Sequence, residues 1–466
     1  MVLLTLLPPE IVHNILSWIR PEDLAAVPRT CRYLHSLVKG NNALCRDIYR
    51  NTLDDPPTND LDWERELHDL VRLRLICARP TAESKKSELS FVYNTVTRLL
   101  KNASRQDYRI SHAVTYPESR NANLLTDLFQ SDENQEAFLS RSFLFERARG
   151  ETNRFQDPPK EEHQQSAKLH SLYGMPLLKH GRTRSSRLYP FACSKVYDLR
   201  QYTRNTRWGP FMNDGSDRVD WEKVEATLLV LRNNIKNKSL DTFPIFSNLW
   251  NVPFAGSWTK SYVPFPIDRE RTDLELEDPY DVSGTWLRVV CFLDYNDFFS
   301  YNFPIGDRLP DNVPRPVLDI GEATRLILMK IHVTRIEKAP AGDIHGHPIV
   351  HFIGFSRSFD GSWDDNANSD LRGTAQMTPE GEVRWTTYSI FNGQERWRSE
   401  GVQIGGVQSA RGVVGSWFDN DFDPHGPCGP TAFWKMSDRE PKSDDKEVFL
   451  HDFLPIGRYL YLVFPD

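Results

Sequence analysis

Three histidines near residue 350 could in principle bind a metal ion. His345, His347 and His351 fall in one short segment, and imidazole nitrogen is a frequent ligand of zinc. The nearest cysteine is far away in the sequence, however, and no carboxylate stands at a recognised ligand spacing. A glycine turn at Gly346 that leads into a strand from Ile349 to Phe355 is the simpler interpretation. We therefore expect no metal site here.

Three aspartates near residue 420 are spaced like the opening of a calcium-binding loop. Asp419, Asp421 and Asp423 alternate with other residues, yet Pro424 replaces the glycine and Pro430 the bidentate glutamate that an EF-hand requires. The chain also has no phosphate-binding glycine loop followed by lysine and no G-x-S-x-G turn. These absences make an enzyme less expected, and we predict no catalytic, cofactor-binding or metal-binding residues.

A third segment carries residue types suited to gripping a peptide. Aromatic and charged side chains lie among glycines and prolines, which stiffen the backbone that presents them. The alternative is that the tryptophans belong to the core and that the Asp-Pro-His-Gly-Pro loop is structural. The candidate substrate-binding residues are Arg411, Trp417, Phe418, Asp423, His425 and Trp434.

Length and composition describe the chain that must position these residues. The 466 residues exceed what one hydrophobic core usually supports, so we expect two or three folding units. Lysine plus arginine (57) against aspartate plus glutamate (64) gives a net charge of −7 without a long basic run. We therefore expect neither nucleic acid nor a membrane as a partner.

The cellular compartment can be inferred from the cysteines and the N-terminus. Six cysteines lie far apart in the sequence and form no C-x-x-C pair, which indicates free thiols in a reducing compartment. The opening MVLLTLLPPE has no basic region before its apolar run, and no stretch approaches the length of a membrane span. We expect a protein of the cytoplasm, the nucleus or both.

The first fifty residues predict three or four short helices. From Pro9 to Arg20 apolar and polar residues alternate at helical spacing, and Pro21 ends that helix and starts the next. Thr30 is the predicted cap of a third helix that ends before Gly40. Helices this short cannot enclose so much apolar surface by themselves, so a partner should cover the remainder.

These residues carry a resemblance to a known module. The segment LLPPEIVHNILSWIRPEDLAAVPRTCRYLHSLV resembles an F-box, with its Leu-Pro-x-Glu opening, Ile-Leu pair, Pro-x-Asp-Leu second helix and Cys-Arg-x-Leu third helix. The resemblance implies docking on a Skp1-like subunit, which in turn joins a cullin and a RING subunit. The alternative is a small helix bundle that forms a core of its own. The residues implied in Skp1 binding are Leu6, Leu7, Pro8, Ile11, Ile15, Leu16 and Leu24.

The middle of the chain predicts a helical and loop-rich scaffold. Asp62 is a candidate cap for a helix that stops before Pro80, and a second helix follows from Leu89 to Leu100. Residues 103–190 are polar and repeatedly interrupted, and we interpret the stretches from Asp157 to Glu162 and from Gly181 to Arg187 as exposed loops or linkers. A further helix begins at Trp221 behind its candidate cap Asp220.

The C-terminal part has the two-residue period of strands. Apolar and polar residues alternate from Ile327 to Thr334, Gly381 lies in a turn between two strand-like runs, and Asn392-Gly393 is typical of a tight hairpin. The tripeptide Gly-Ser/Thr-Trp recurs at irregular spacing, at residues 256–258, 284–286, 361–363 and 415–417. Glycines that bend strands and tryptophans that seal a core favour a closed barrel, with a sandwich as the alternative.

The predicted fold class is therefore an α+β multidomain protein. Its domains would be an F-box at residues 1–50, a helical and loop-rich scaffold at 51–240, and a β-rich substrate-binding domain at 241–466, an antiparallel lipocalin-like barrel or a sandwich. The stretch from Leu371 to Lys435 resembles the C-terminal domain of fungal F-box proteins, which is distantly similar to the cyclin D1-binding type.

Three functions are compatible with this domain arrangement. The first is a non-catalytic substrate receptor of an SCF-type ubiquitin ligase, which would act by raising the local concentration of a target protein near the ubiquitin-loaded enzyme. The second is a sensor whose barrel holds a small hydrophobic molecule, for which a dry apolar cavity would be the signature. An enzyme is third, because it would need convergent polar residues with shifted pKa values in that cavity.

Overall fold

The computed structural model forms two compact units, Met1–Arg141 and Ser142–Asp466. The domain limits expected at residues 50 and 240 stay predictions. The residues that the structure describes are 6–58, 60–105, 118–150, 160–177, 182–240, 246–263, 270–304, 306–311, 313, 315–339, 346–358 and 368–438, and of residues 182–187 and 247–248 it describes the backbone only.

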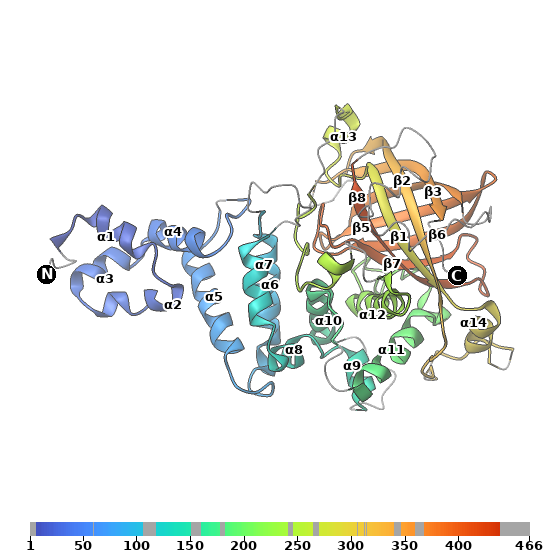
Figure 1. Ribbon diagram of the computed structural model, residues 1–466, viewed down its shortest axis with the longest axis horizontal. Helices are drawn as coiled ribbons and strands as arrows, with labels where there is room; N and C mark the ends of the chain where they lie inside the picture. The colour runs from blue at the N-terminus through green and yellow to red at the C-terminus, as the bar shows by residue number, and fades with distance from the viewer. Residues whose placement is uncertain are drawn as a thin grey trace. The chain divides into compact units, whose positions relative to one another are not determined.

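The first unit is helical throughout its described part (Figure 1). Its helices are α1 (Pro9–Leu16), α2 (Pro21–Leu24), the 3-10 turn η2 (Val27–Arg29), α3 (Arg32–Val38), α4 (Asn42–Thr52), α5 (Trp63–Cys77), the 3-10 turn η3 (Lys86–Glu88), α6 (Leu89–Lys101), α7 (Arg120–Leu128) and α8 (Asp132–Phe138).

Two details of the N-terminal helices differ from the prediction. Helix α1 ends at Leu16 rather than at Arg20, because the residue before a proline avoids the helical conformation and Arg20 is extended. The cap of α3 is Cys31, whose backbone is extended, and the Thr30 hydroxyl instead donates a hydrogen bond to the Val27 carbonyl. The predicted cap Asp62 is confirmed, since its carboxylate accepts from the Arg65 amide at the start of α5.

The second unit combines helices with a sheet. The helical elements are α9 (Phe143–Arg149), α10 (Glu161–Tyr173), α11 (Arg182–Val196), the 3-10 turn η4 (Leu199–Gln201), α12 (Trp221–Asn237), the π-helical turn η6 (Phe246–Trp250), α13 (Asp273–Glu277) and α14 (Tyr295–Asn302).

The two stretches predicted as loops or linkers contain helix where the structure describes them. Helix α10 begins at Glu161 and α11 at Arg182, while residues 157–159 and 181 lie outside the described residues. Helix α10 is buried although its sequence is polar. Its polar side chains face inward and are paired: Gln164 both donates to Asp220 and accepts from the Trp221 amide. A helix whose polar residues face the interior shows no apolar stripe, so the periodicity that identifies helices is missing.

The predicted helix behind Asp220 is confirmed as α12. The Asp220 carboxylate accepts from the amides of Glu222 and Lys223, as an N-cap should. Helix α12 packs against strands β7, β8 and β1 of the sheet described next, and α10 and α11 pack on α12 (Figure 1). No helix in the described part of the chain is long and apolar enough to cross a membrane.

The sheet is a closed barrel in which every strand runs antiparallel to the next in the chain, and β8 closes it against β1. The predicted antiparallel barrel is confirmed, and the sandwich alternative is not. The strands are β1 (Gly284–Phe292), β2 (Ala323–Glu337), β3 (Ile349–Ser358), β4 (Ser369–Met377), β5 (Val383–Phe391), β6 (Gln394–Gln403), β7 (Val413–Asp419) and β8 (Cys428–Ser437).

Local turn chemistry explains the order of the strands. Asn392 and Gly393 both have positive φ, 51° and 78°, which is the geometry of the tight turn between β5 and β6. Gly381, with φ 83°, lies in the predicted turn between β4 and β5. Each hairpin joins neighbours in sequence, so the meander needs one long-range pairing, β1 with β8, to close.

One end of the barrel interior is filled by aromatic side chains. Trp286 of β1 and Trp385 of β5 meet edge to face with ring centroids 5.0 Å apart, and Phe433 and Phe352 pack against them. These belong to a larger buried apolar cluster that extends along β2, β3 and β4. This aromatic plug fills one part of the interior, and a cavity lies at the other end.

Candidate functional site

The N-terminal helices present apolar side chains to solvent. Leu6 and Trp18 are each 73% exposed, and Ile11 and Ile15, one helical turn apart on α1, are 48% and 45% exposed. Trp18 lies in the turn that ends α1, a further three residues along. Exposed apolar side chains that cluster in this way commonly mark a surface that a partner protein covers. We call these four residues the apolar face.

The apolar face stands on a fixed support. The buried side of α1 carries Val12 and Leu16, and α1 packs against α4. His13 Nε2 lies 2.9 Å from the Asp47 carboxylate, and the Asn51 amide donates to the Ser17 carbonyl at 2.9 Å. Because α1 is tied to α4 near its middle and at its C-terminal end, the apolar face is held in one orientation.

The residues predicted for Skp1 binding divide between surface and interior. Leu6, Pro8, Ile11 and Ile15 are exposed, and Leu7 and Leu24 are half-buried. Leu16 is only 4% exposed and belongs to the core of the helices, so it supports the surface instead of forming it. The prediction left out Trp18, although the spacing of Ile11, Ile15 and Trp18 was readable in the sequence. Their role in binding Skp1 stays a prediction.

The second candidate site is a cavity of about 390 Å³ in the open end of the barrel. This is within the range of small-molecule sites, about 300–1,000 Å³. Its walls combine aromatic rings, arginines and hydroxyl groups, and none of the described residues that line it is acidic. The lining residues are Arg288, Val290, Phe292, Arg325, Ile327, Ser356, Ser369, Ser389, Phe391, Arg396, Trp397 and Trp417.

A β-bulge explains why two successive residues line this cavity. Neighbouring residues of a strand normally point to opposite faces. Between β5 and β6, however, Ser389 pairs with Trp397 while Ile390 pairs with Glu395, which leaves Arg396 as an extra residue. Bulges of this kind redirect side chains near functional sites. Here both Arg396 and Trp397 line the cavity.

Arg288 is the buried cation of the cavity. It follows Trp286 on the inward side of β1 and is only 6% exposed. Its Nε donates to the Thr431 hydroxyl at 2.9 Å. Burial lowers the pKa of the Arg288 guanidinium to about 10, and no nearby charge offsets that effect in the described part of the chain. The group nevertheless remains protonated at neutral pH.

Trp417 of β7 forms another part of the cavity wall. Its indole meets that of Trp397 edge to face at 5.2 Å, and its Nε1 donates to the Cys291 carbonyl at 3.0 Å. This ring lies over Gly429, where an added Cβ would come within 2.7 Å of Trp417 Nε1 and 2.4 Å of the Cys291 oxygen. A residue without a side chain is therefore required at this position.

The six predicted substrate-binding residues do not form one site. Trp417 lines the cavity, but Phe418, the next residue on the strand, points to the outer face and stacks with Trp208 and Phe422. Strand alternation separates the two. Asp423 and His425 lie exposed in the loop between β7 and β8, where the His425 ring packs on Phe299 of α14 and on Phe303, the residue that follows this helix.

Arg411 and Trp434 are both buried in this structure, at 2% and 0% exposure, and their role in substrate binding stays a prediction. The Arg411 guanidinium donates to the carbonyls of Leu249, Val252, Ala255 and Tyr173. Trp434 is fully buried and donates from Nε1 to the Arg411 carbonyl at 2.9 Å. Both therefore hold segments of the second unit together.

Sequence reasoning missed most of the cavity, including Arg288, Arg325 and Arg396. One signal was present: Arg288 is a single charge inside the otherwise apolar run TWLRVVCF. It stands two residues after Trp286 and two before Val290, on the face that those side chains share. A charge on the inward face of a buried strand indicates either a buried pair or a binding site.

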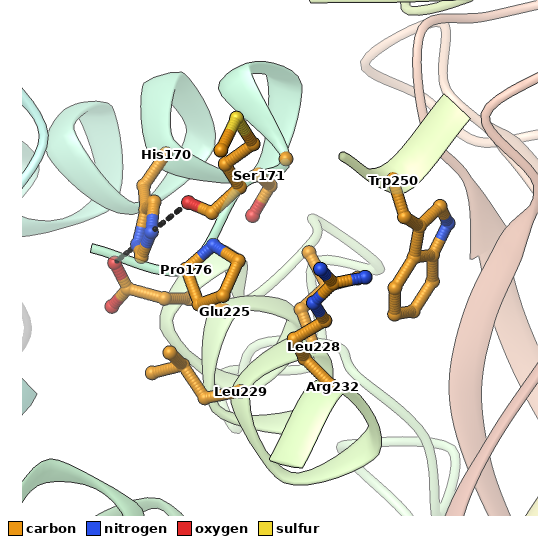
Figure 2. Close-up of a pocket in the computed structure, with 10 residues that line it drawn as sticks. His170, Ser171, Pro176, Glu225, Leu228, Leu229, Arg232 and Trp250 are labelled. Atoms are coloured by element: carbon orange, nitrogen blue, oxygen red, sulfur yellow. Dashed lines mark hydrogen bonds and ion pairs between the residues drawn. The ribbon is translucent and has the colours of Figure 1, made fainter. Parts of the chain in front are cut away.

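A smaller pocket contains a buried His170 and Glu225 pair and is not a substrate site (Figure 2). His170 Nδ1 lies 2.7 Å from the Glu225 carboxylate, and Nε2 lies 3.1 Å from the Met175 carbonyl. Both imidazole nitrogens are therefore occupied. The space of about 10 Å³ accommodates one water molecule at most. The pair joins α10 to α12.

The predicted absence of a metal site stays a prediction. No group of three or more histidine, cysteine or acidic residues that could hold a metal ion is found among the described residues. His345 lies outside the described residues. His351 contacts Glu337 and Arg335 on the outside of the barrel, and the His347 ring lies 6.1 Å from that of Tyr280.

Comparison with known proteins identifies one region. Residues 4–51 match the family model of F-box-like domains. No curated protein and no solved structure matches the chain. The chain thus carries an F-box-like domain in the region of the apolar face. F-box domains suggest Skp1 binding in the context of SCF-type ubiquitin ligases, and F-box proteins are generally non-catalytic substrate adaptors.

Proposed function

We propose that this protein is a substrate-recognition adaptor of an SCF-type ubiquitin ligase. The observation that carries the proposal is the apolar face, four exposed hydrophobic residues within the F-box-like domain. A Skp1-like subunit would cover this face and link the chain to a cullin and a RING subunit. The β-barrel unit would hold the target protein.

Such an adaptor needs no catalytic residue of its own. It accelerates ubiquitin transfer by holding the target close to the loaded enzyme, which is an effect of local concentration. We extend the proposal to location in the cytoplasm, the nucleus or both, without nucleic acid or membrane as a partner. We also propose kinship with fungal F-box proteins whose C-terminal domain is distantly similar to the cyclin D1-binding type.

The test is co-purification with Skp1 after charge is placed in the apolar face. The double substitution Ile11→Asp and Ile15→Asp should weaken binding by about 100-fold or more, because two desolvated carboxylates would enter the interface. The matched control is Leu75→Asp, since Leu75 is an exposed leucine (64%) of the same unit on α5. This control variant should bind as the original chain does.

Circular dichroism should show the same helix content in all three proteins, because none of the substituted residues is buried. Failure of the folded, unsubstituted chain to bind Skp1 would contradict the adaptor proposal. Equal weakening by Leu75→Asp and by the double substitution would show that the interface lies elsewhere on the unit.

A second candidate function is a barrel that binds a small ligand, and the 390 Å³ cavity favours it. The cavity is not the dry apolar space expected for a purely hydrophobic ligand, because arginines and serines share its walls with aromatic rings. The description of the barrel as lipocalin-like belongs to this candidate and remains a proposal. Both functions could coexist in one adaptor whose ligand controls its turnover.

A further inference from the structure

The barrel cavity has a distinct charge pattern. Arg288 lies at its inner part, and Arg325 and Arg396 lie on strands that begin at the open end of the barrel. Arg325 lies over the ring of Phe292, and Arg396 over the rings of Phe391 and Trp397. Three cations around one enclosed space, without an acid among the described lining residues, create a positive potential inside it.

Arg288 is the cation that most requires an explanation. Burying a charge is costly unless the charge is paired. In the described part of the chain, Arg288 has one hydrogen-bond acceptor, the neutral hydroxyl of Thr431, and it has no ion pair. Arg288 is also one of the residues that line the cavity.

Other buried cations of this unit are compensated by the protein itself. Arg315 pairs with Asp198 at 3.0 Å, and Lys435 pairs with Asp281 at 2.5 Å. Arg411 donates to four backbone carbonyls. The protein therefore supplies partners to its structural cations, whereas Arg288 has one neutral acceptor in the described part of the chain and lines a cavity.

The walls indicate what else the ligand contains. Phe292, Phe391, Trp397 and Trp417 offer flat aromatic surfaces. The hydroxyls of Ser356 and Ser369 are 2.8 Å apart and form a hydrogen bond with each other, so neither needs a hydrogen bond from a ligand. A neutral hydrocarbon would fill the aromatic part and leave Arg288 unpaired, whereas a free inorganic anion would leave the rings uncovered.

We propose that the barrel cavity binds a small organic acid, with its anionic head on Arg288 and its aromatic or other apolar body between Trp397, Trp417 and the phenylalanines. Arg325 and Arg396 attract the anion at the open end. The head group is a carboxylate or a phosphate, both of which arginine binds through paired N–H donors. This inference rests on the second candidate function and is independent of Skp1 docking.

The first experiment measures binding to the full chain by calorimetry with three probes that share one body. Naphthylacetate carries a carboxylate, naphthylmethyl phosphate carries a phosphate, and the methyl ester of naphthylacetic acid is neutral. At least one acid should bind saturably at one site, and the ester should bind at least about tenfold more weakly, because charge-assisted hydrogen bonds to arginine are lost. The stronger of the two acids identifies the head group.

The second experiment locates the probe. In protein labelled with fluorotryptophan, the fluorine resonances of Trp397 and Trp417, assigned through their Trp→Phe variants, should move on binding. The Arg288→Gln variant should lose at least about tenfold in affinity for the acid and little for the ester. Its matched control is Arg335→Gln, since Arg335 is an exposed arginine on the outside of β2, paired with Glu337 and His351. That control should bind as the unsubstituted chain does.

Three results would overturn the inference: equal affinity for acid and ester, binding that leaves the two tryptophan resonances in place, or no saturable binding of either acid at millimolar concentration. The comparison of acid with ester uses the unsubstituted protein, so it remains decisive even if Arg288→Gln misfolds. Loss of Skp1 binding in the Ile11 and Ile15 variant, with acid binding intact, would separate this inference from the adaptor proposal.

Discussion

Asp278 shows how the interior of the second unit changes the chemistry of a single residue. Its carboxylate accepts the amides of Tyr280 at 2.8 Å and Val282 at 2.7 Å, just before β1 begins. Both hydrogen bonds favour the ionised form. Burial is the larger effect, however, and raises the pKa of the Asp278 carboxyl from 3.8 to about 6.

This shift predicts a pH dependence of stability. Between about pH 4 and pH 6 the folded protein keeps a proton on Asp278 that the unfolded chain releases, so the free energy of unfolding falls as pH rises through that window. The loss should amount to roughly 3 kcal/mol. Urea unfolding at pH 4, 5 and 6.5 measures it, and carbon NMR of the carboxyl gives the pKa directly. In Asp278→Asn this part of the pH dependence should vanish; a variant with an unchanged pH profile would refute the assignment.

At the scale of single residues, the sequence indicated which types of residue could bind a ligand better than it indicated which way each side chain points. Trp417 was singled out as a candidate substrate-binding residue; it lines the cavity, and its role in binding stays a prediction. Its neighbour Phe418 points to the opposite face, and the sequence alone did not separate them because the strand register was unknown. Arg396 lines the cavity through a bulge, which depends on how two strands pair and not on the residues of one strand.

At the scale of elements, a helix with an apolar stripe could be predicted from the sequence, whereas a helix that buries polar residues could not. Helix α12 was found because it has a clear cap and an apolar pattern. Helix α10 was missed because it buries His163, Gln164 and His170 against partners on other elements. Those partners are distant in sequence, so periodicity could not reveal the helix.

Arg411 provides a test of how these elements are joined. It connects the end of α10, through the Tyr173 carbonyl, to the turns that follow η6, and burial lowers its pKa to about 9. Replacing it by methionine keeps much of the volume but leaves buried carbonyls without a donor. We expect Arg411→Met to reduce the free energy of unfolding of the second unit by about 3 kcal/mol or more.

Urea unfolding followed by tryptophan fluorescence measures this effect. The matched control is Arg335→Met, because Arg335 is exposed and its ion pair with Glu337 lies on the surface, where such pairs contribute ~1 kcal/mol or less. If Arg411→Met were no more destabilising than this control, Arg411 would not be a structural joint and its prediction as a binding residue would have to be reconsidered.

At the scale of the whole molecule, closure of the barrel was predictable in kind but not in detail. The hairpin turns at Gly381 and Asn392-Gly393 specify neighbours, so a meander followed from local sequence. The pairing of β8 with β1 joins residues such as Arg288 and Phe433, which no local pattern connects. The aromatic plug likewise draws on strands from across the domain, so the position of the cavity beside it could not be read from the sequence.

The division into two compact units predicts that they unfold separately. Leu73 of α5 and Leu231 of α12 are both leucines with 0% exposure, one in each unit. Substituting either by alanine removes the same methyl groups from a packed core and should cost about 2–5 kcal/mol. In calorimetry of the full chain we therefore expect two unfolding transitions. Leu73→Ala should lower the midpoint of one transition, and Leu231→Ala should lower the midpoint of the other. On heating, Skp1 binding should be lost in the transition whose midpoint Leu73→Ala lowers. Organic-acid binding should be lost in the transition whose midpoint Leu231→Ala lowers. A single transition lowered equally by both substitutions would mean that the two units fold as one cooperative body.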